Sequence, residues 1–347
     1  MARKQKKRQL DSSVYYSFES IDTRNAILNF VIGSRGNGKT YGAKEKAIRN
    51  YLRYGNEFIY LRRYKEELAT FSTFFNDIAD QFPDYQFRVI GRTAQIRRRC
   101  DGDEFPWKTI GYGMVLSVAQ QLKGSSYPKV GSIIFDEFII EKGVIRYLTN
   151  EVETFLNFYN TIDRYRDTVK VYFLANAISI ANPYFVYFKI DVADRIRTYH
   201  NNYIAVEFCD SANYIKEVEK TRFGQFVRSV DPEYASYVMD NSFHDSTTTF
   251  IDKKHPKFIP VMNIKNRMGT YSVWIHPDNM ANIHVQSTLI KNADYNLTCQ
   301  LESIDETWTH VEWNSKLLAR LRTSYRYGMM TFDSPQTRVI FNDTMKR

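Results

Sequence analysis

The sequence has 347 residues, of which 43% are hydrophobic and 15% aromatic, and this fits a globular protein of about two domains with an aromatic-rich core. No apolar run is long enough to span a membrane, and the three cysteines and six histidines fit no zinc-ligand spacing, so a membrane protein and a zinc protein are excluded. The net charge of +9 favours a polyanionic partner.

The first part of the chain alternates short apolar runs with helical patterns. In chain order we expect a strand at 27–32, a helix at 40–54, a strand at 57–61, a helix at 66–81, a hairpin at 86–98, strands at 114–118 and 132–135, a helix at 150–161 and a strand at 169–174. Strands that alternate with helices predict right-handed crossovers and a mainly parallel sheet. We therefore expect one α/β domain over residues 1–208.

The remaining sequence changes character twice. Residues 209–237 are rich in charge and predict a linker or small helical segment. After it, the expected elements are strands at 247–251, 258–261, 271–275 and 282–286, followed by a helix at 313–326. These elements predict a second, smaller α+β domain over residues 238–347.

A complete phosphate-binding loop, G-x-x-x-x-G-K-[ST], lies between the first expected strand and the first expected helix. Its glycines allow close approach of the backbone, whose N–H groups converge on the β-phosphate of a bound nucleotide. The lysine reaches the β- and γ-phosphates, and the threonine hydroxyl ligates Mg²⁺. The residues predicted to bind ATP and Mg²⁺ are Gly33, Ser34, Arg35, Gly36, Asn37, Gly38, Lys39, Thr40 and, as a second metal ligand, Asp136.

Asp136 and Glu137 follow the strand at 132–135, at the sheet edge where ligands bind in parallel α/β domains. Asp136 is expected to hold the metal ion, and Glu137 to polarise the attacking water. Asn176 follows the strand at 169–174 and is placed to contact the γ-phosphate. Arg164 or Arg166 is a candidate arginine finger for a neighbouring subunit, with a salt-bridged surface loop as the alternative.

These features together resemble the DNA-packaging ATPases of phi29-like bacteriophages. The segments that carry the resemblance occur in the same order and comprise residues 27–33, 58–65, 134–139, 176–177 with 182–185, and 220–224. The resemblance implies a P-loop ATPase of the additional-strand, catalytic-glutamate (ASCE) class. It also implies an ATP-driven homopentameric ring that moves double-stranded DNA through the portal, or connector, into a preformed prohead.

The resemblance also assigns residues and a location. It implies that Arg164 acts on the neighbouring subunit, that Lys123 is a second such residue, and that Lys65 faces the DNA. It implies action in the host cytoplasm, transiently at the portal vertex, with absence from the mature virion. Some relatives use a packaging RNA, and whether this chain needs one stays open.

The resemblance further implies that the second domain is RNase H-like and a degenerate nuclease. His276 lies where an acid is expected, with Asp252 and Asp278 as the remaining acids nearby. An active nuclease of this kind needs several carboxylates that converge on two metal ions. We therefore expect a non-catalytic domain that binds nucleic acid or the portal.

Three other functions stay open at this point. One is another ASCE motor, such as a helicase or a terminase with an active nuclease. The second is a nucleotide-gated assembly protein, which Glu137 argues against because a pure binder needs no water-polarising acid. The third is a small-molecule kinase, for which the sequence has no clear lid.

Overall fold

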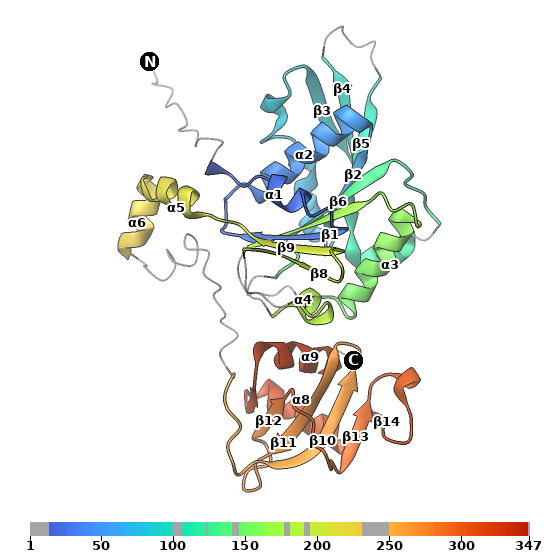
Figure 1. The fold of residues 1–347 in the computed structure, drawn as a ribbon, viewed down its shortest axis with the longest axis vertical. Helices are drawn as coiled ribbons and strands as arrows, with labels where there is room; N and C mark the ends of the chain where they lie inside the picture. Colours follow the sequence, from blue (N-terminus) through green and yellow to red (C-terminus); the bar gives the residue numbers. More distant parts are fainter. Residues whose placement is uncertain are drawn as a thin grey trace. The chain divides into compact units, whose positions relative to one another are not determined.

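The structure is a computed structural model that describes residues 14–99, 106–122, 124–140, 146–176, 181–190, 195–230 and 250–345. The chain divides into two compact units. The first comprises Met1–Leu148, Glu153–Ile178 and Ala193–His244, and the second comprises Thr149–Val152, Ser179–Val192 and Asp245–Arg347. Figure 1 shows the sheets and helices of each unit. In the described part of the chain, no helix is both long and apolar enough to cross a membrane.

A nine-stranded sheet organises the described residues of the first unit. Its strands are β1 Leu28–Gly33, β2 Glu57–Arg62, β3 Tyr85–Ile90, β4 Thr93–Arg98, β5 Lys108–Val115, β6 Val130–Asp136, β7 Lys170–Asn176, β8 Ile196–Tyr199 and β9 Ile204–Phe208, in the order β3-β4-β5-β2-β6-β7-β1-β9-β8. Neighbouring strands from β5 to β9 in this order are parallel. Antiparallel pairs lie at both ends. The mainly parallel sheet expected from the sequence is confirmed.

Helices cover both faces of this sheet, namely α1 Glu19–Asp22, α2 Lys39–Tyr54 and α3 Glu151–Asp163, with 3-10 segments at Glu66–Thr73, Ala79–Gln81 and Leu116–Leu122. Helices α5 Ala212–Glu219 and α6 Arg222–Val230 pack against each other in a small apolar cluster of their own. The residues of α1 and α2 join one buried cluster with β2 and β7, through side chains such as Tyr60 and Tyr172. On α3, Phe155 packs against Phe135 of β6 and Phe173 of β7. Because side chains alternate along a strand, β7 supplies Tyr172 to one face and Phe173 to the other.

Two expected elements differ from the structure. The helix expected over 66–81 is instead a series of 3-10 segments and turns. Its buried residues Leu68, Phe71 and Phe74 are spaced by three, which suits the three-residue turn of a 3-10 helix. The strand expected at 114–118 begins earlier, at Lys108, and ends at Val115. Strands β8 and β9 were not expected.

The described residues of the second unit form a six-stranded sheet. Its strands are β10 Ile259–Asn266, β11 Gly269–Ile275, β12 Ile283–Gln286, β13 Tyr295–Thr298, β14 Thr309–His310 and β15 Met330–Phe332, in the order β14-β13-β10-β11-β12-β15. The unit also holds α4 Pro183–Tyr187, α8 Lys316–Arg326, α9 Pro335–Met345 and the 3-10 segment Leu301–Ser303.

Strand directions in this second sheet are mixed. Strands β10, β11 and β12 are antiparallel neighbours, whereas β13 pairs parallel with β10, and β14 with β13. An antiparallel meander followed by strands parallel to its first strand is the arrangement of an RNase H-like sheet, so the α+β fold is as expected. The strand expected at 247–251 lies largely outside the described residues, and β13, β14, β15 and α9 were not expected.

Candidate nucleotide-binding site

The phosphate loop connects the carboxyl end of β1 to the first turn of α2. Gly36 and Gly38 have φ values of 81° and 88°, a left-handed conformation that glycine adopts without strain. Gly38 also caps α2, so the N–H groups of the loop and of the first helical turn gather at one place. This arrangement is suited to an anion such as a nucleotide phosphate.

Lys39 is buried within the loop that precedes it. Its Nζ donates to the backbone oxygens of Gly33 at 3.0 Å and Ser34 at 2.7 Å, and to the side-chain oxygens of Asn37 at 3.1 Å and Asn176 at 3.4 Å. Burial lowers the pKa of Lys39 to about 8, although the charge of nearby Asp136 raises it. Asn176 ends β7 in register with Gly33, which explains why two segments far apart in sequence meet at this ammonium group.

Asp136 and Thr40 form the oxygen-rich side of the site. The Thr40 hydroxyl lies 3.2 Å from both carboxylate oxygens of Asp136, and the Tyr60 hydroxyl donates to Oδ2 at 2.9 Å. Burial raises the pKa of the Asp136 carboxyl, and the Arg62 guanidinium partly opposes this shift. A hydroxyl and a buried carboxylate side by side are the hard oxygen ligands that Mg²⁺ takes in nucleotide sites, where water and phosphate oxygens fill the remaining positions. These residues therefore fit Mg²⁺.

Glu137 is presented at the carboxyl end of β6 by an uncommon backbone conformation. Its φ is 56°, and its side chain is 63% exposed, whereas Asp136 beside it is buried. The fully buried Arg63 donates to the backbone oxygens of Glu137 at 3.2 Å and Phe138 at 2.6 Å, and thereby holds this turn. A carboxylate held in a left-handed turn next to a metal-binding acid is suited to act on a water molecule.

Arg62 is a site residue that the sequence reasoning missed. Its guanidinium donates to Glu137 Oε2 at 2.5 Å and lies 3.8 Å from Asp136 Oδ2 and 3.5 Å from Glu67 Oε1. It therefore neutralises both acids of the site. Its position at the end of β2, in the pair Arg62-Arg63, was the available signal, because the ends of neighbouring parallel strands meet at one edge of the sheet.

Lys65 lies just beyond this pair, at the start of the 3-10 segment Glu66–Thr73, and its side chain is exposed. The backbone N–H of Tyr64 donates to Glu67 Oε2 at 2.6 Å, and the same carboxylate faces Arg62. Glu67 thus contacts the backbone beside Lys65 and also faces Arg62, which in turn donates to Glu137.

The loop after α3 distinguishes the two candidate fingers. Arg166 is tied to backbone oxygens of its own unit, namely those of Tyr127, Pro128, Val130, Ile162 and Asp163. Arg164 is exposed and donates to the backbone oxygen of Ser125 at 2.5 Å. Arg166 is thus structural, and Arg164 is the one of the two whose position suits a finger.

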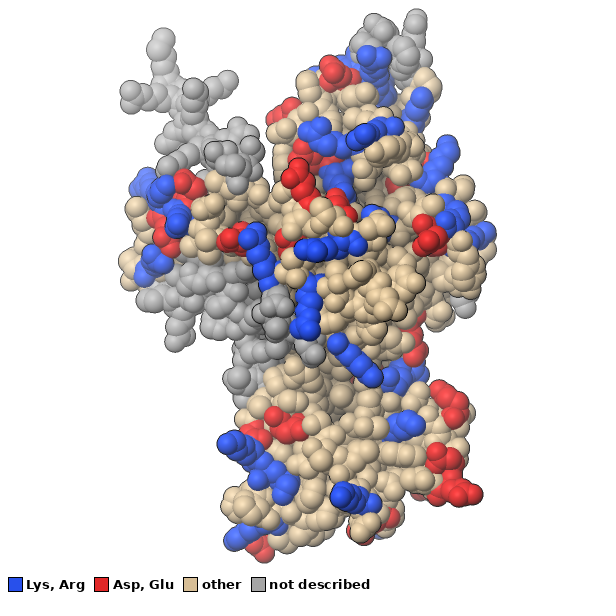
Figure 2. All heavy atoms as spheres, in the orientation of Figure 1, with Lys and Arg blue, Asp and Glu red and all other residues tan. Residues whose placement is uncertain are grey.

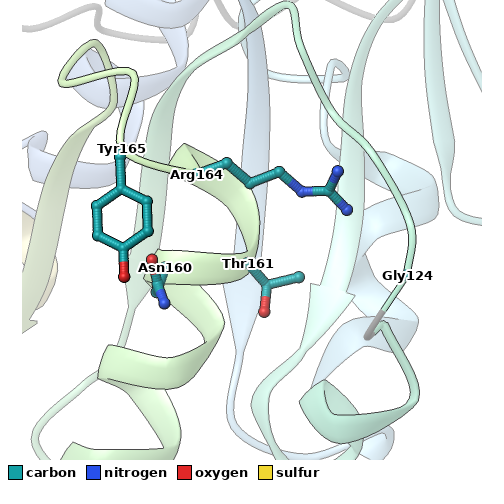
Figure 3. A pocket seen from close by; sticks show the side chains of 5 residues that line it. All are labelled: Gly124, Asn160, Thr161, Arg164 and Tyr165. Carbon is teal, nitrogen blue, oxygen red and sulfur yellow. The ribbon is translucent and has the colours of Figure 1, made fainter.

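The loop is rigid although its side chains are exposed. Asp163 accepts hydrogen bonds from the backbone N–H groups of Asp167, Thr168 and Val169, at 3.0 to 3.2 Å. Arg164 and Tyr165 have φ values of 48° and 60°, and Tyr165 is 91% exposed. Figure 3 shows the Arg164 side chain extended toward Gly124, beside a pocket of about 270 Å³ lined by Gly124, Asn160, Thr161, Arg164 and Tyr165.

The structure brings together most of the residues predicted for the nucleotide site. Lys39, Thr40, Asp136 and Asn176 are joined by hydrogen bonds, and Glu137 follows Asp136 directly. Arg164 contacts Ser125 rather than the phosphate loop, among the residues that the structure describes. Lys123, the other residue implied to act on a neighbouring subunit, lies outside the described residues.

Comparison with known proteins agrees with this site. The sequence profile of the podovirus DNA encapsidation protein (Gp16) family matches residues 10–347. The chain is 38% identical to the DNA packaging protein of Bacillus phage B103, over 92% of this chain and 97% of that protein.

Solved structures are similar as well. A chain of the bacteriophage Phi-29 viral genome packaging motor assembly has a TM-score of 0.69 and 32% identity, covering 96% of this chain and 99% of that one. The N-terminal domain of the DNA packaging ATPase from bacteriophage phi29 has a TM-score of 0.52 and 41% identity, covering 58% of this chain and 99% of that domain. The phosphate loop, the paired acids and these full-length similarities lead to one conclusion: the chain belongs to the podovirus DNA encapsidation protein (Gp16) family.

Proposed function

We propose that this chain is the ATP-hydrolysing subunit of a ring motor that drives double-stranded viral DNA through a portal into a prohead, in the host cytoplasm. The observation that carries the proposal is the pairing of a complete phosphate loop, at the carboxyl end of β1, with Asp136 and Glu137 at the carboxyl end of β6, two parallel strands with β7 between them. Because the chain belongs to the DNA encapsidation family, we propose that DNA is its substrate, in double-stranded form.

The residues of one chain supply the binding and hydrolytic groups. Lys39 exchanges its bonds to loop oxygens for the β- and γ-phosphate oxygens of ATP, while the loop N–H groups hold the phosphates. Thr40 and Asp136 would hold Mg²⁺, which offsets phosphate charge when bound. Glu137 accepts a hydrogen bond from the attacking water and orients it, and Asn176 stands beside Lys39 to contact the γ-phosphate.

A second copy supplies the remaining positive charge. We assign Arg164 as the group that offsets charge on the γ-phosphate of the neighbouring subunit, with Lys123 as its companion. The support is that Arg164 is exposed on a rigid loop and has no catalytic group to act on within the described residues of its own unit. A homo-oligomeric ring, a pentamer in our proposal, then makes hydrolysis depend on the position of the neighbour.

DNA is gripped through its phosphates, because packaging must accept every sequence in the genome. On the face shown in Figure 2, Lys and Arg side chains are interspersed with Asp and Glu. Lys65 is our candidate DNA contact, since it is exposed and matches the position that the family resemblance assigns to the DNA-facing surface.

The second unit is non-catalytic in this proposal and binds nucleic acid or the portal. Within the described residues, no cluster of three His, Cys, Asp or Glu is placed to hold a metal ion. His276 directly follows β11 and contacts Phe258, and its Nδ1 accepts a hydrogen bond from the backbone of Asp278. A terminase with an active nuclease is the alternative, and metal-dependent cleavage of plasmid DNA would distinguish it.

The experiment that tests the proposal is steady-state ATP hydrolysis with and without linear double-stranded DNA, for the unsubstituted chain and Glu137→Gln. We expect DNA to stimulate hydrolysis, and the substitution to lower the rate by about 10²-fold or more while ATP still binds. Hydrolysis that ignores DNA, even with portal-bearing proheads present, would reject the motor in favour of a nucleotide switch or a small-molecule kinase.

A further inference from the structure

Two tyrosines from distant parts of the sequence flank the phosphate loop. Tyr15 precedes α1, and Tyr214 lies on α5. A Cβ atom at Gly38 would lie 2.9 Å from Cδ1 of Tyr15, and one at Gly36 would lie 2.3 Å from the hydroxyl oxygen of Tyr214. Both rings therefore press against the two loop glycines that have positive φ values. The ring centroids are 6.3 Å apart, with 42° between the ring planes.

Both tyrosines are anchored to the loop through Asn37. The backbone oxygen of Asn37 accepts a hydrogen bond from the N–H of Tyr16 at 2.9 Å, and its side-chain Nδ2 donates to the Ser211 hydroxyl at 3.3 Å. Tyr16 in turn donates through its hydroxyl to Glu207 at 2.7 Å. The segment that carries Tyr15 and the segment that leads into Tyr214 are thus fastened to the same loop residue.

A nucleotide bound here must direct its base away from the phosphate cradle. The phosphates occupy the loop N–H groups and the start of α2, so the base leaves beside the residues that border the loop. Bases bind to proteins by stacking on aromatic faces. The two rings are 6.3 Å apart and tilted by 42°, which is the geometry of an aromatic pair in contact, so a base would stack on this pair and not between its members.

We propose that Tyr15 and Tyr214 form the subsite for the nucleobase of the bound nucleoside triphosphate. This inference rests on the proposed ATPase function. It assigns residues that contact the base of the nucleotide, whereas the phosphate loop contacts the phosphates. The two rings recognise the π face of the base, so the subsite favours a purine over a pyrimidine through the larger stacked area. It also distinguishes a nucleotide from inorganic triphosphate.

Base binding at Tyr214 has a consequence for α5 and α6. These helices share a small apolar cluster, in which Val227 is buried and Ile215 and Val218 are partly buried. So few buried side chains stabilise a helix pair weakly. A base stacked on Tyr214 therefore orders residues 212–230, and inorganic triphosphate, which lacks a base, does not.

The test compares binding of ATP, CTP and inorganic triphosphate to the full chain and to Tyr15→Ala, Tyr214→Ala and Tyr214→Phe. We expect each alanine variant to bind ATP about tenfold more weakly and to bind inorganic triphosphate normally, because stacking is lost and the phosphate cradle is kept. Tyr214→Phe keeps the ring and should bind ATP normally. Tyr54→Ala, at the opposite end of α2, is the matched control.

The outcomes separate this inference from the function on which it rests. Equal weakening of ATP and inorganic triphosphate would show that the tyrosines only shape the loop, and would overturn the inference. Normal ATP binding in both alanine variants would overturn it too and leave the ATPase function intact. If the unsubstituted chain bound no ATP, both would fail. Hydrogen exchange provides a second measurement, since ATP but not triphosphate should protect residues 212–230.

Discussion

The phosphate loop and the loop after α3 each carry a basic side chain, Lys39 and Arg164, but the two side chains differ in burial. Lys39 is buried and donates hydrogen bonds to groups of its own unit, including Asn37 and Asn176. Arg164 is exposed, although the backbone that carries it is fixed by Asp163 and Arg166. One region encloses its cation, and the other presents its cation on a rigid support.

The contrast between buried Lys39 and exposed Arg164 indicates which groups of the proposed active site come from the same chain and which from a neighbouring one. In our proposal, the phosphate loop, Asp136 and Glu137 form the binding and hydrolytic half of the site within one chain. The loop of Arg164 holds three residues, Arg164, Tyr165 and Asp167, in left-handed conformations, and such conformations persist only where the surrounding structure fixes them. A rigid, exposed arginine without a substrate on its own surface is suited to a second copy of the chain, which is the arrangement that we propose for the ring.

The largest expected effect separates the two arginines of this loop. Arg164→Ala should lower ATP hydrolysis by about 10³-fold, the lower end of the range for an arginine finger, with ATP binding unchanged. The measurement is the steady-state rate together with equilibrium nucleotide binding. In rings mixed with unsubstituted chains, Arg164→Ala should also impair its neighbours. Loss of ATP binding would instead make Arg164 a ligand within its own chain and reject the finger.

Arg166→Ala is the matched comparison and should act on stability. It removes the Arg166 donor from several backbone oxygens around residues 127–130, at a cost of about 2 kcal/mol in the free energy of unfolding. Chemical denaturation of the two variants measures this difference. A stable Arg166→Ala chain with the activity loss expected of Arg164→Ala would reverse our assignment of the two residues.

The same contrast explains what could be read from the sequence. Gly33 to Thr40 and the pair Asp136-Glu137 were predictable because each is a local pattern between a strand and its neighbouring element. The contacts of Arg62 with Glu137, and of Tyr214 with Gly36, join residues far apart in the chain, and no local pattern records them. The local pattern also left Arg164 and Arg166 equivalent, and only the family resemblance pointed to Arg164, because backbone oxygens that bind a side chain leave no signature in the sequence.

In the fold as well, the elements with a clear local pattern were predicted and the others were not. The central strands β1, β2, β6 and β7 are continuous apolar runs and were expected. The segment at 66–81 has helix-forming residues, but the spacing of its buried aromatics suits a 3-10 helix, so local propensity misled. Strands β8 and β9 are short and lie at or next to the end of the sheet, where the apolar pattern is weaker.

Arg62→Gln should change the pH dependence of ATP hydrolysis, an effect intermediate in size between those of the other substitutions. The guanidinium opposes the upward shift of the pKa of Asp136, so its removal raises that pKa further. A carboxylate with a higher pKa is protonated at higher pH, and the acid limb of the pH–rate profile should move to higher pH. Arg49→Gln, on the exposed face of α2, is the control. An acid limb that stays in place would mean that Arg62 does not tune these acids.

A smaller effect should appear in the pH dependence of nucleotide binding. Burial lowers the pKa of Lys39 to about 8, and contact with phosphates favours its charged form. Binding therefore takes up a proton above pH 8, and ATP affinity should be full below that pH and fall by up to about tenfold per pH unit above it. Titration calorimetry from pH 7 to pH 9.5 or so measures this, with circular dichroism as the control for folding. Constant affinity would place the Lys39 pKa well above this range.

The smallest effect is expected for Lys65. Its side chain is exposed, like that of Arg164, and it immediately precedes the 3-10 segment Glu66–Thr73. A single phosphate contact contributes about one unit to the slope of log affinity against log salt. Lys65→Ala should therefore lower that slope by about one for each subunit in contact with DNA, while hydrolysis without DNA stays the same. Lys108→Ala, an exposed lysine at the start of β5, is the control. Equal slopes in both variants would remove Lys65 from the DNA surface. A loss of hydrolysis without DNA would mean that Lys65 also affects Glu137, by way of Glu67 and Arg62. Lys65 would then belong to the nucleotide site as well as to the DNA surface.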